Sequence, residues 1–155
     1  MSNLKTTNKM IRIITVATLT LLTMSLSAHA AGDRPIVPEQ LPAAIHQFLK
    51  KHFPDAVIRY ASVDNDFFDK DYTVRLSDQT EVEFDDNNLW KEIDRGTQPI
   101  PADLIPLPIA QHIDKYFGGE TIVKIERDRK HFEVKLKSGL EITFDRQYKA
   151  VDYDD

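Results

Sequence analysis

The 155-residue sequence contains no cysteine, so disulfide bonds cannot stabilise its fold, which must depend on packing alone. Without cysteine, the chain also lacks the residue that carries the lipid of a bacterial lipoprotein. A glycine-rich phosphate loop, a nucleophile elbow and the H-E-x-x-H zinc motif are absent as well. We therefore predict a protein that is not an enzyme, with no catalytic residues, no metal site and no cofactor.

The first 30 residues have the pattern of a targeting segment rather than of a folded element. Three basic residues precede an apolar run over residues 13–26, and an A-x-A site ends at Ala30. This arrangement is typical of a cleavable secretory signal peptide. The run of about 14 residues is shorter than the roughly 20 that a membrane-spanning helix needs. We predict cleavage between Ala30 and Ala31, a periplasmic or secreted product, and no stable membrane anchoring afterwards.

The charge of the remaining chain limits its partners. Removing residues 1–30 takes away three basic and no acidic residues, which changes the formal net charge from −5 to −8. An acidic surface repels the phosphates of nucleic acids and the headgroups of anionic lipids. We therefore expect no nucleic acid and no membrane surface among the partners.

An internal repeat organises the rest of the sequence. Two pairs of segments match at an offset of sixty residues, namely 72–77 with 132–137 and 81–85 with 141–145. The next segment matches only after a two-residue deletion, and this alignment pairs Trp90 with Tyr148. Upstream, the matching offset is sixty-four, so the first copy holds four extra residues between its helix and its second strand. Repeats of this kind indicate one supersecondary unit written twice.

Each copy begins with an amphipathic helix. Apolar, aromatic and histidine residues recur at the helical spacing i, i+3, i+4 and i+7, which are Ile45, Phe48, Leu49 and His52, then Ile109, His112, Ile113 and Tyr116. A proline at each helix start suits the first turn, where its missing N–H is no loss. His52 and His112 are interpreted as packing residues of these helices, whereas His46 and His131 are interpreted as surface residues.

After each helix the apolar period changes from 3.6 to two. Alternation predicts strands near 57–63, 72–77, 81–85 and 89–94 in the first copy, with short polar turns between them. The fold class is therefore α+β, with two tandem helix-plus-antiparallel-sheet repeats of about four strands each and one exposed polar face per sheet. The predicted organisation is a signal peptide (1–30), a lead-in (31–40), a first repeat (41–94), a linker (95–104) and a second repeat (105–155).

The marked positions of this pattern resemble the PepSY-like family of exported bacterial proteins, described as β-lactamase-inhibitor-like. The resemblance covers nearly all of residues 38–152 and is carried by Leu41-Pro42-x-x-Ile45, Phe53-Pro54, Tyr72-x-Val74, Glu83-Phe84-Asp85 and Trp90-Lys91-Glu92-Ile93-Asp94. It implies a fold similar to that of β-lactamase-inhibitory protein. It also implies non-catalytic binding of another protein, with inhibition or modulation of an exported peptidase or other hydrolase as the activity.

Aromatic and acidic residues supply a candidate partner-binding surface. Phe67 and Phe68 lie in the four-residue expansion of the first copy and, being adjacent, are not both expected to point inward. Strand alternation places Trp90 on the face of Glu92 and opposite Ile93, over the polar side of the sheet. The predicted surface comprises Trp90, Tyr148, Phe67, Phe68, Glu83 and Glu92. The alternative interpretation is that these aromatic rings cover the edges of a small sheet.

Two further functions remain open from the sequence. One is a periplasmic carrier of a small ligand or peptide, which would use the concave sheet face. The other is a hydrolase with an unrecognised site. The acidic segment 64–71 was compared with a calcium-binding EF-hand loop, which needs glycine at position six and glutamate at position twelve. The sequence has Asp69 and Arg75 at these positions, so the EF-hand pattern is not met, and weak calcium binding by this acidic segment stays open.

Overall fold

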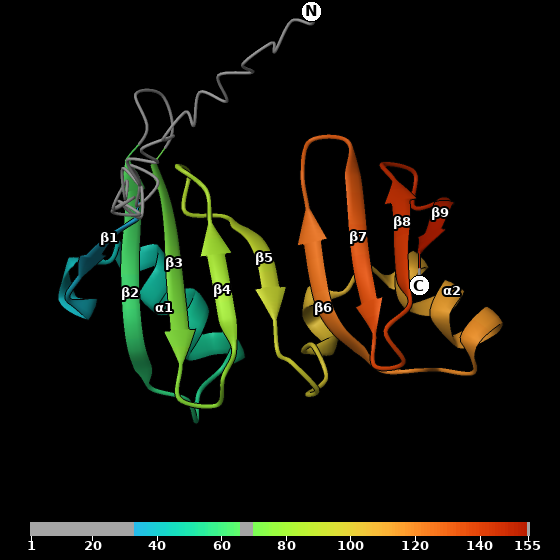
Figure 1. Ribbon diagram of the computed structural model, residues 1–155, viewed down its shortest axis with the longest axis horizontal. Coiled ribbons are helices and arrows are strands. Elements are labelled where there is room, and N and C mark those ends of the chain that lie inside the picture. The colour runs from blue at the N-terminus through green and yellow to red at the C-terminus, as the bar shows by residue number, and fades with distance from the viewer. Residues whose placement is uncertain (1–32, 66–69, 155) are drawn as a thin grey trace, which may run out of the picture.

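The computed structural model of the chain describes residues 33–65 and 70–154. The predicted signal peptide and its cleavage site lie outside the described residues, as do Phe67 and Phe68. In this part of the chain, nine strands form one antiparallel sheet in sequential order, with two α-helices (Figure 1). The elements are β1 (Asp33–Ile36), η1 (Pro38–Gln40), α1 (Ala43–His52), β2 (Ile58–Asn65), β3 (Lys70–Leu76), β4 (Glu81–Phe84), β5 (Trp90–Asp94), η2 (Ala102–Leu104), α2 (Leu107–Phe117), β6 (Ile122–Arg127), β7 (His131–Leu136), β8 (Glu141–Asp145) and β9 (Ala150–Asp154).

The two helices start as the sequence predicts, and their predicted stripes face the core except at Tyr116, which lies in the last turn of α2 and is 60% exposed. Each follows a proline at its N-cap, whose carbonyl accepts the first hydrogen bonds of the helix. The buried residues of each helix are spaced four apart and form a single apolar stripe, which are Ile45 and Leu49 in α1, then Ile109 and Ile113 in α2. Gly118 ends α2 in the left-handed conformation, with φ of 63°. Among the described residues, no helix is long and apolar enough to cross a membrane.

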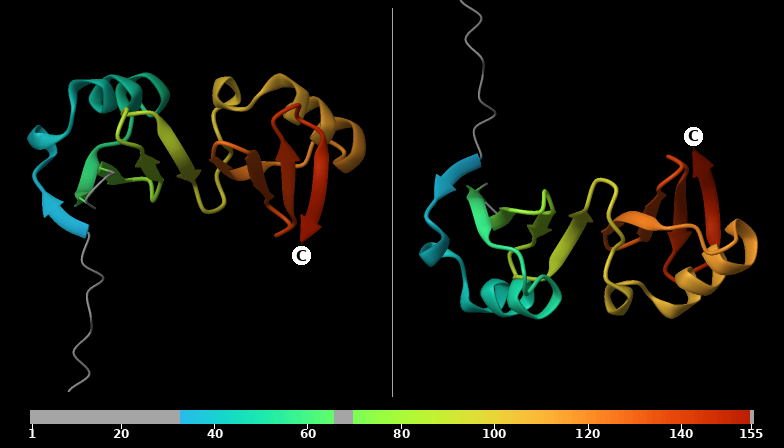
Figure 2. Two further views of the ribbon diagram at one scale, coloured as in Figure 1. Left: turned by 90° about the horizontal axis from the view of Figure 1, so that it is seen from above. Right: turned by 90° about the horizontal axis from the view of Figure 1, so that it is seen from below.

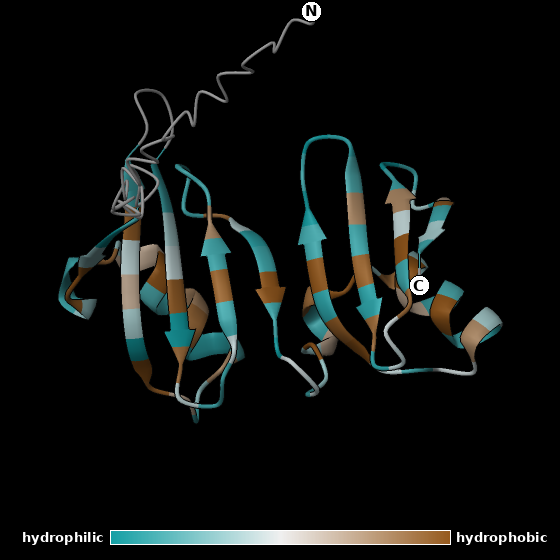
Figure 3. Cartoon of the chain, in the orientation of Figure 1, coloured by the Kyte–Doolittle hydropathy of each residue, from teal (hydrophilic) through white to brown (hydrophobic). Residues whose placement is uncertain are grey.

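Both helices cover the same face of the sheet (Figure 2). Apolar and polar residues alternate along the strands (Figure 3), so one side of each strand faces the helices. The helix-facing residues Val74, Val82, Phe84, Val134 and Phe144 are each 0% exposed. They belong to one apolar cluster that runs through both halves of the molecule. The core is therefore a single layer between the sheet and the two helices.

The α+β class is confirmed, but the strands form one sheet rather than two. β5 pairs with β6 through Glu92↔Glu126, Ile93↔Ile125 and Asp94↔Lys124, which joins the two halves. If the halves were separate sheets, β5 and β6 would be edge strands with unpaired backbone N–H and C=O groups. Their pairing gives these groups hydrogen-bond partners. The sheet thus has one continuous open face.

The predicted lead-in contributes a strand of its own. β1 pairs antiparallel with β2, from Asp33↔Asp64 to Ile36↔Ala61, and covers that edge of the sheet. Its position at the edge accommodates Pro35, which has no N–H to donate to a ladder.

The strand registers correct the sequence alignment of the two halves. Phe84 pairs with Trp90 in the first half, and Phe144 pairs with Ala150 in the second. The turn before each final strand is also the same, because the Oδ1 atoms of Asp85 and Asp145 accept equivalent backbone N–H groups. The offset is sixty throughout these hairpins, so the two-residue deletion was wrong.

The sequence alignment of Trp90 with Tyr148 is consequently wrong. Ala150, not Tyr148, is the counterpart of Trp90. Tyr148 corresponds to Asn88, and the two share a left-handed turn conformation, with φ of 59° and 61°. Asparagine adopts this conformation readily, whereas a tyrosine there is uncommon. Trp90 and Tyr148 align in sequence because both are aromatic, but the type of a side chain does not reveal the geometry of the turn that holds it.

Candidate functional site

The open face of the sheet carries a row of four glutamates. Residues that pair across antiparallel strands lie on the same face, so the registers define rows of side chains across the sheet. Glu83 pairs with Glu92, Glu92 with Glu126, and Glu126 with Glu133. These four residues, here called the glutamate row, occupy adjacent strands from β4 to β7 and cross the junction between the two halves.

Among the described residues, Glu92 is the one member of the glutamate row that forms an ion pair. Glu92 forms an ion pair with Lys124 at 2.9 Å. Within the described residues, Glu83, Glu126 and Glu133 make no hydrogen bond or ion pair. Burial, together with the charge of Glu92, raises the pKa of both Glu83 and Glu126 above the ordinary value for a glutamate, although the nearby charges of Lys91 and Lys124 act in the opposite direction. Like charges directly opposite each other destabilise a sheet, so the row has an energetic cost.

The neighbouring row of the same face is compensated instead. In it, Arg75 pairs with Glu81, and Lys135 contacts Glu141 at 2.7 Å. The hydrogen bond from Lys135 lowers the pKa of Glu141. The glutamate row, in contrast, has a single ion pair for its four carboxylates.

Replacing two members of the row is expected to stabilise the protein. Glu83→Gln with Glu126→Gln should raise the free energy of unfolding at pH 7 by about 0.5–1 kcal/mol, because like-charge repulsion is removed. A carboxyl group whose pKa is raised by folding favours the fold below its unfolded pKa, and this contribution is lost as pH rises through the folded pKa. Wild type should therefore gain stability from these groups as pH falls from 7 towards the ordinary glutamate value of 4.5, and the variant should lack this gain.

Urea denaturation at pH 7 and pH 5 measures this difference. Glu141→Gln is the matched control, because it makes the same substitution on the same face at a residue whose pKa is lowered. The control should lose a little stability at pH 7 rather than gain it. A double variant less stable than wild type at pH 7 would contradict the proposed repulsion.

The structure separates Trp90 from the predicted glutamates. Glu83 pairs with Glu92 while Phe84 pairs with Trp90, so Lys91 is the extra residue of a β-bulge. The bulge reverses the alternation, and Trp90 therefore shares the helix-side face of Phe84, where it is half-buried against the core. The prediction that Trp90 lies on the face of Glu92 was wrong, because simple alternation does not anticipate a bulge.

The six predicted partner-binding residues do not form one described surface. Glu83 and Glu92 lie directly opposite each other on the open face. Tyr148 packs against Phe132, with ring centroids 5.3 Å apart, and so lies against the core together with Trp90. Phe67 and Phe68 fall outside the described residues. Sequence reasoning missed Glu126 and Glu133, because their relation to Glu83 and Glu92 depends on the β5–β6 pairing.

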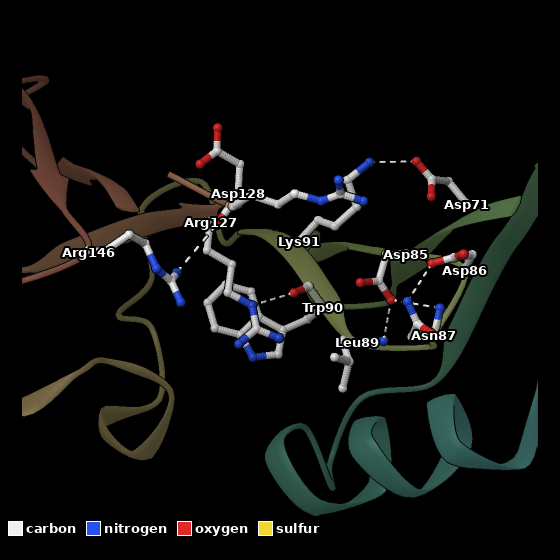
Figure 4. A pocket seen from close by; sticks show the side chains of 11 residues that line it. Asp71, Asp85, Asp86, Asn87, Leu89, Trp90, Lys91, Arg127, Asp128 and Arg146 are labelled. Carbon is white, nitrogen blue, oxygen red and sulfur yellow. Dashed lines mark hydrogen bonds and ion pairs between the residues drawn. The ribbon is translucent and has the colours of Figure 1, made fainter. Parts of the chain in front are cut away.

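β5 and β6 diverge beyond their short pairing (Figure 1). A groove of about 490 Å³ lies there (Figure 4). Trp90 and Arg127 are in its wall, and the Nε of Arg127 donates a hydrogen bond to the Trp90 carbonyl at 2.7 Å. The guanidinium carbon lies 4.0 Å from the centroid of the indole ring. The remaining lining residues are Asp71, Asp85, Asp86, Asn87, Leu89, Lys91, Asp128, Arg129 and Arg146. Arg127 lies two residues after Ile125 in β6, so strand alternation would have predicted that both side chains lie on the same, apolar face.

His46, His52 and His112 each contact neighbouring groups of the fold. His112 packs edge-on against Phe144, with ring centroids 5.2 Å apart, and His52 packs against Phe48 at 4.5 Å. His46 is half-buried and contacts the carbonyl of Pro38 at 2.9 Å, so its prediction as a surface residue was wrong. Within residues 33–65 and 70–154, no group of three or more histidine, aspartate or glutamate side chains is placed to hold a metal ion. The acidic segment 64–71 lies partly outside these residues.

Comparison with known proteins identifies a family and solved relatives. The family model described as "Putative beta-lactamase-inhibitor-like, PepSY-like" matches residues 70–152. A search of curated proteins found no match. A periplasmic protein of the DUF2874 family from Bacteroides vulgatus is 36% identical, with a TM-score of 0.77, over 81% of this chain and 99% of that chain.

Two other crystal structures are similarly close. A Bacteroides thetaiotaomicron protein, described as "a putative calcium-regulated periplasmic protein", is 35% identical, with a TM-score of 0.74, over 79% of this chain and 97% of that chain. A second Bacteroides vulgatus periplasmic protein of unknown function is 33% identical, with a TM-score of 0.75, over 80% of this chain and 100% of that chain.

Proposed function

Since the chain belongs to the PepSY-like, β-lactamase-inhibitor-like family, we propose that it is an exported, non-catalytic module that binds another protein through the open face of its sheet. The observation that carries this proposal is the glutamate row. Natural proteins tend to retain locally unfavourable arrangements at functional sites. A basic partner surface would relieve the repulsion within the row on binding.

The position of the row suits an interface. It crosses the middle of a face that neither helix covers (Figure 2), so a partner can approach it along the whole width of four strands. Complementary charge accelerates encounter and excludes like-charged competitors. Glu83 and Glu92 keep their predicted role in this proposal, and Glu126 and Glu133 join them. Trp90, Tyr148, Phe67 and Phe68 remain predictions.

The description of the family points to a class of partner. We propose that the partner is an exported hydrolase, such as a peptidase, whose activity the protein inhibits or modulates. The three solved relatives are described as periplasmic, which supports the same compartment for this chain. Export by a signal peptide cleaved between Ala30 and Ala31 is part of the proposal.

Binding by variants of the row tests this function. A native pull-down from periplasmic extract with wild type identifies the partner, and calorimetry then measures its Kd. Removing the three unpaired charges, by Glu83→Gln, Glu126→Gln and Glu133→Gln, should weaken binding about 10- to 100-fold, as loss of charged contacts does at interfaces. The salt dependence of the Kd should also become flatter.

A second triple variant controls for net charge. Glu39→Gln, Asp55→Asn and Asp114→Asn remove the same charge from exposed positions outside the open face, and this variant should bind like wild type. Equal affinities for all three proteins would contradict the proposed surface. Because one relative is described as calcium-regulated, each measurement is made with added calcium and with a chelator.

A second candidate function is a periplasmic carrier of a small ligand or peptide. The observation that favours it is the groove beside Trp90, whose volume of about 490 Å³ falls in the range of small-ligand sites. This candidate differs from the carrier predicted from the sequence, since that one used the sheet face. A carrier would bind a ligand without any protein partner, so ligand titration of the isolated protein separates the two functions.

We also propose that residues 41–94 and 105–155 are two copies of one motif. Each helix precedes four consecutive strands. The registers of the following hairpins recur at an offset of sixty, as Val74↔Val82 and Val134↔Ile142 show. The β-bulge in the last strand of each half recurs at the same offset.

A further inference from the structure

The groove between the two halves contains a half-buried arginine with unused donors. Arg127 is the last residue of β6, and its pairing with Phe132 places it on the apolar, helix-side face. Its Nε donates to the Trp90 carbonyl, while its two Nη groups make no hydrogen bond or ion pair within the described residues. A guanidinium carries five N–H donors and remains charged at any physiological pH. Most of its capacity therefore faces the groove.

Within the described residues, no carboxylate of the groove forms an ion pair or hydrogen bond with Arg127, although the charge of Asp85 acts on it from a distance. Asp71 pairs with Lys91 at 2.5 Å, and the Oδ1 of Asp85 accepts the backbone N–H groups of its own turn. The Oδ1 of Asp128 likewise accepts backbone N–H groups, from Lys130 and His131.

Arg146 adds a second cation to the same site. Its Nη1 donates to the backbone carbonyl of Asp128 at 3.3 Å, and it forms no ion pair within the described residues. Burial acts most strongly and lowers the pKa of Arg127, the charge of Asp85 partly opposes this, and the charge of Arg146 lowers the pKa further. Two arginines that line one groove without direct carboxylate partners define a place where an anion is favourable.

The walls of the groove narrow the class of anion. Trp90 and Leu89 supply apolar surface, and the guanidinium of Arg127 stacks on the indole (Figure 4). Asp86 and Asp128 also line the groove, and their charges disfavour a dianion such as phosphate. A planar carboxylate matches the two-pronged geometry of a guanidinium. A short peptide with a free C-terminus combines this carboxylate with apolar side chains of suitable size.

From this geometry we infer that the groove binds the C-terminal carboxylate of a short peptide, with Arg127 and Arg146 as its charged partners and Trp90 as the apolar wall. This site uses none of the residues of the glutamate row. The inference therefore stands or falls separately from protein binding on the open face. It also supplies the ligand class for the carrier function.

Trp90 makes the test direct, because it is the only tryptophan of the chain. Its fluorescence is followed while three probes are added to the full protein: acetyl-Gly-Leu with a free carboxylate, the same peptide as its C-terminal amide, and inorganic phosphate. The free acid should give a saturable change, and the amide and phosphate should give none. Arg146→Gln should raise the Kd about tenfold or more, because one charged hydrogen-bonding partner is lost.

Two further variants make the result specific. Arg127→Met retains much of the apolar contact with Trp90 and should abolish binding of the free acid. Arg59→Gln, at an exposed position of β2, is the control and should bind like wild type. Thermal melting shows whether each variant is folded. If Arg127→Met fails to fold, Arg146→Gln alone decides the result. Absence of a saturable change, equal binding of the amide, a response to phosphate alone, or wild-type affinity in Arg146→Gln would overturn the inference.

Discussion

Phe84→Ala is expected to lower the free energy of unfolding by about 3–5 kcal/mol, as removal of a fully buried aromatic ring does. The ring is 0% exposed and meets the ring of Phe48 on α1 edge-on, with centroids 5.3 Å apart. The surrounding core is close-packed, so the cavity left beneath α1 is only partly filled by relaxation. Urea denaturation followed by circular dichroism measures the loss.

The second half offers an internal comparison. Phe144 is also 0% exposed, and its edge-on partner is His112 of α2 at 5.2 Å. Phe144→Ala should therefore cost about as much as Phe84→Ala. Because β5 pairs with β6 and the core forms one cluster, both substitutions should shift the same single unfolding transition. Two separate transitions, one moved by each variant, would show that the halves unfold independently.

An exposed aromatic residue provides the control. Tyr116 lies on α2 with 60% of its surface exposed, so Tyr116→Ala should change stability by less than about 0.5 kcal/mol. A loss below about 1 kcal/mol in Phe84→Ala would contradict its assignment to the core.

Arg95→Ala is expected to destabilise the protein by about 2–3 kcal/mol, because it leaves several partners of one side chain unpaired. Arg95 follows β5 and its side chain is only 15% exposed. It donates hydrogen bonds to Thr80 at 3.1 Å, to Asp78 at 2.8 Å, to Gln98 at 3.0 Å and to the Pro99 carbonyl at 2.7 Å. These contacts tie the chain after β5 to the β3–β4 turn.

The pKa of Asp78 gives this prediction a second readout. Burial raises the pKa of Asp78, but hydrogen bonds from Thr80 and Arg95 outweigh burial and hold it below the ordinary value. A carboxyl group whose pKa is lowered by folding stabilises the fold above its unfolded pKa, and this contribution is lost as pH falls through the folded pKa. As the pH falls below about 4, the free energy of unfolding of Arg95→Ala should therefore decrease less than that of wild type.

A double-mutant cycle with Asp78→Ala isolates the pair, and urea denaturation provides the four free energies. A coupling of about 1 kcal/mol or more between Arg95 and Asp78 is expected for a charged hydrogen bond. Arg34→Ala, at an exposed position of β1, is the control and should be near neutral. No loss of stability in Arg95→Ala would show that the contacts after β5 are not structural.

Much of the fold could be predicted from local sequence patterns. Prolines at the helix starts, the stripe that contains Ile45 and Leu49, and the alternation around Val74 each report the structure of their own segment. Such signals involve residues a few positions apart, and the structure retains them. The predicted packing role of His112 is of the same kind.

The predicted positions of Trp90 and Tyr148 were wrong because the backbone is irregular at or beside each residue. A single bulge at Lys91 moved Trp90 from the open face to the helix-side face. Tyr148 was aligned by its aromatic character, whereas its place in the structure follows from a left-handed turn. Neither feature has a dependable residue signature, because many side chains tolerate a bulge and the turn conformation is imposed by its surrounding hydrogen bonds.

The sequence by itself determined both helices and most of the strands, the apolar face of most of these segments, and the acidic balance of the chain. Tertiary structure alone decided that the strands join into one sheet, that Glu92 meets Glu126, and that Arg127 meets Trp90. The physical reason is that periodicity is a property of neighbours in the chain. Contact between strands depends instead on the register of segments that are distant in sequence, and this register results from packing the whole core.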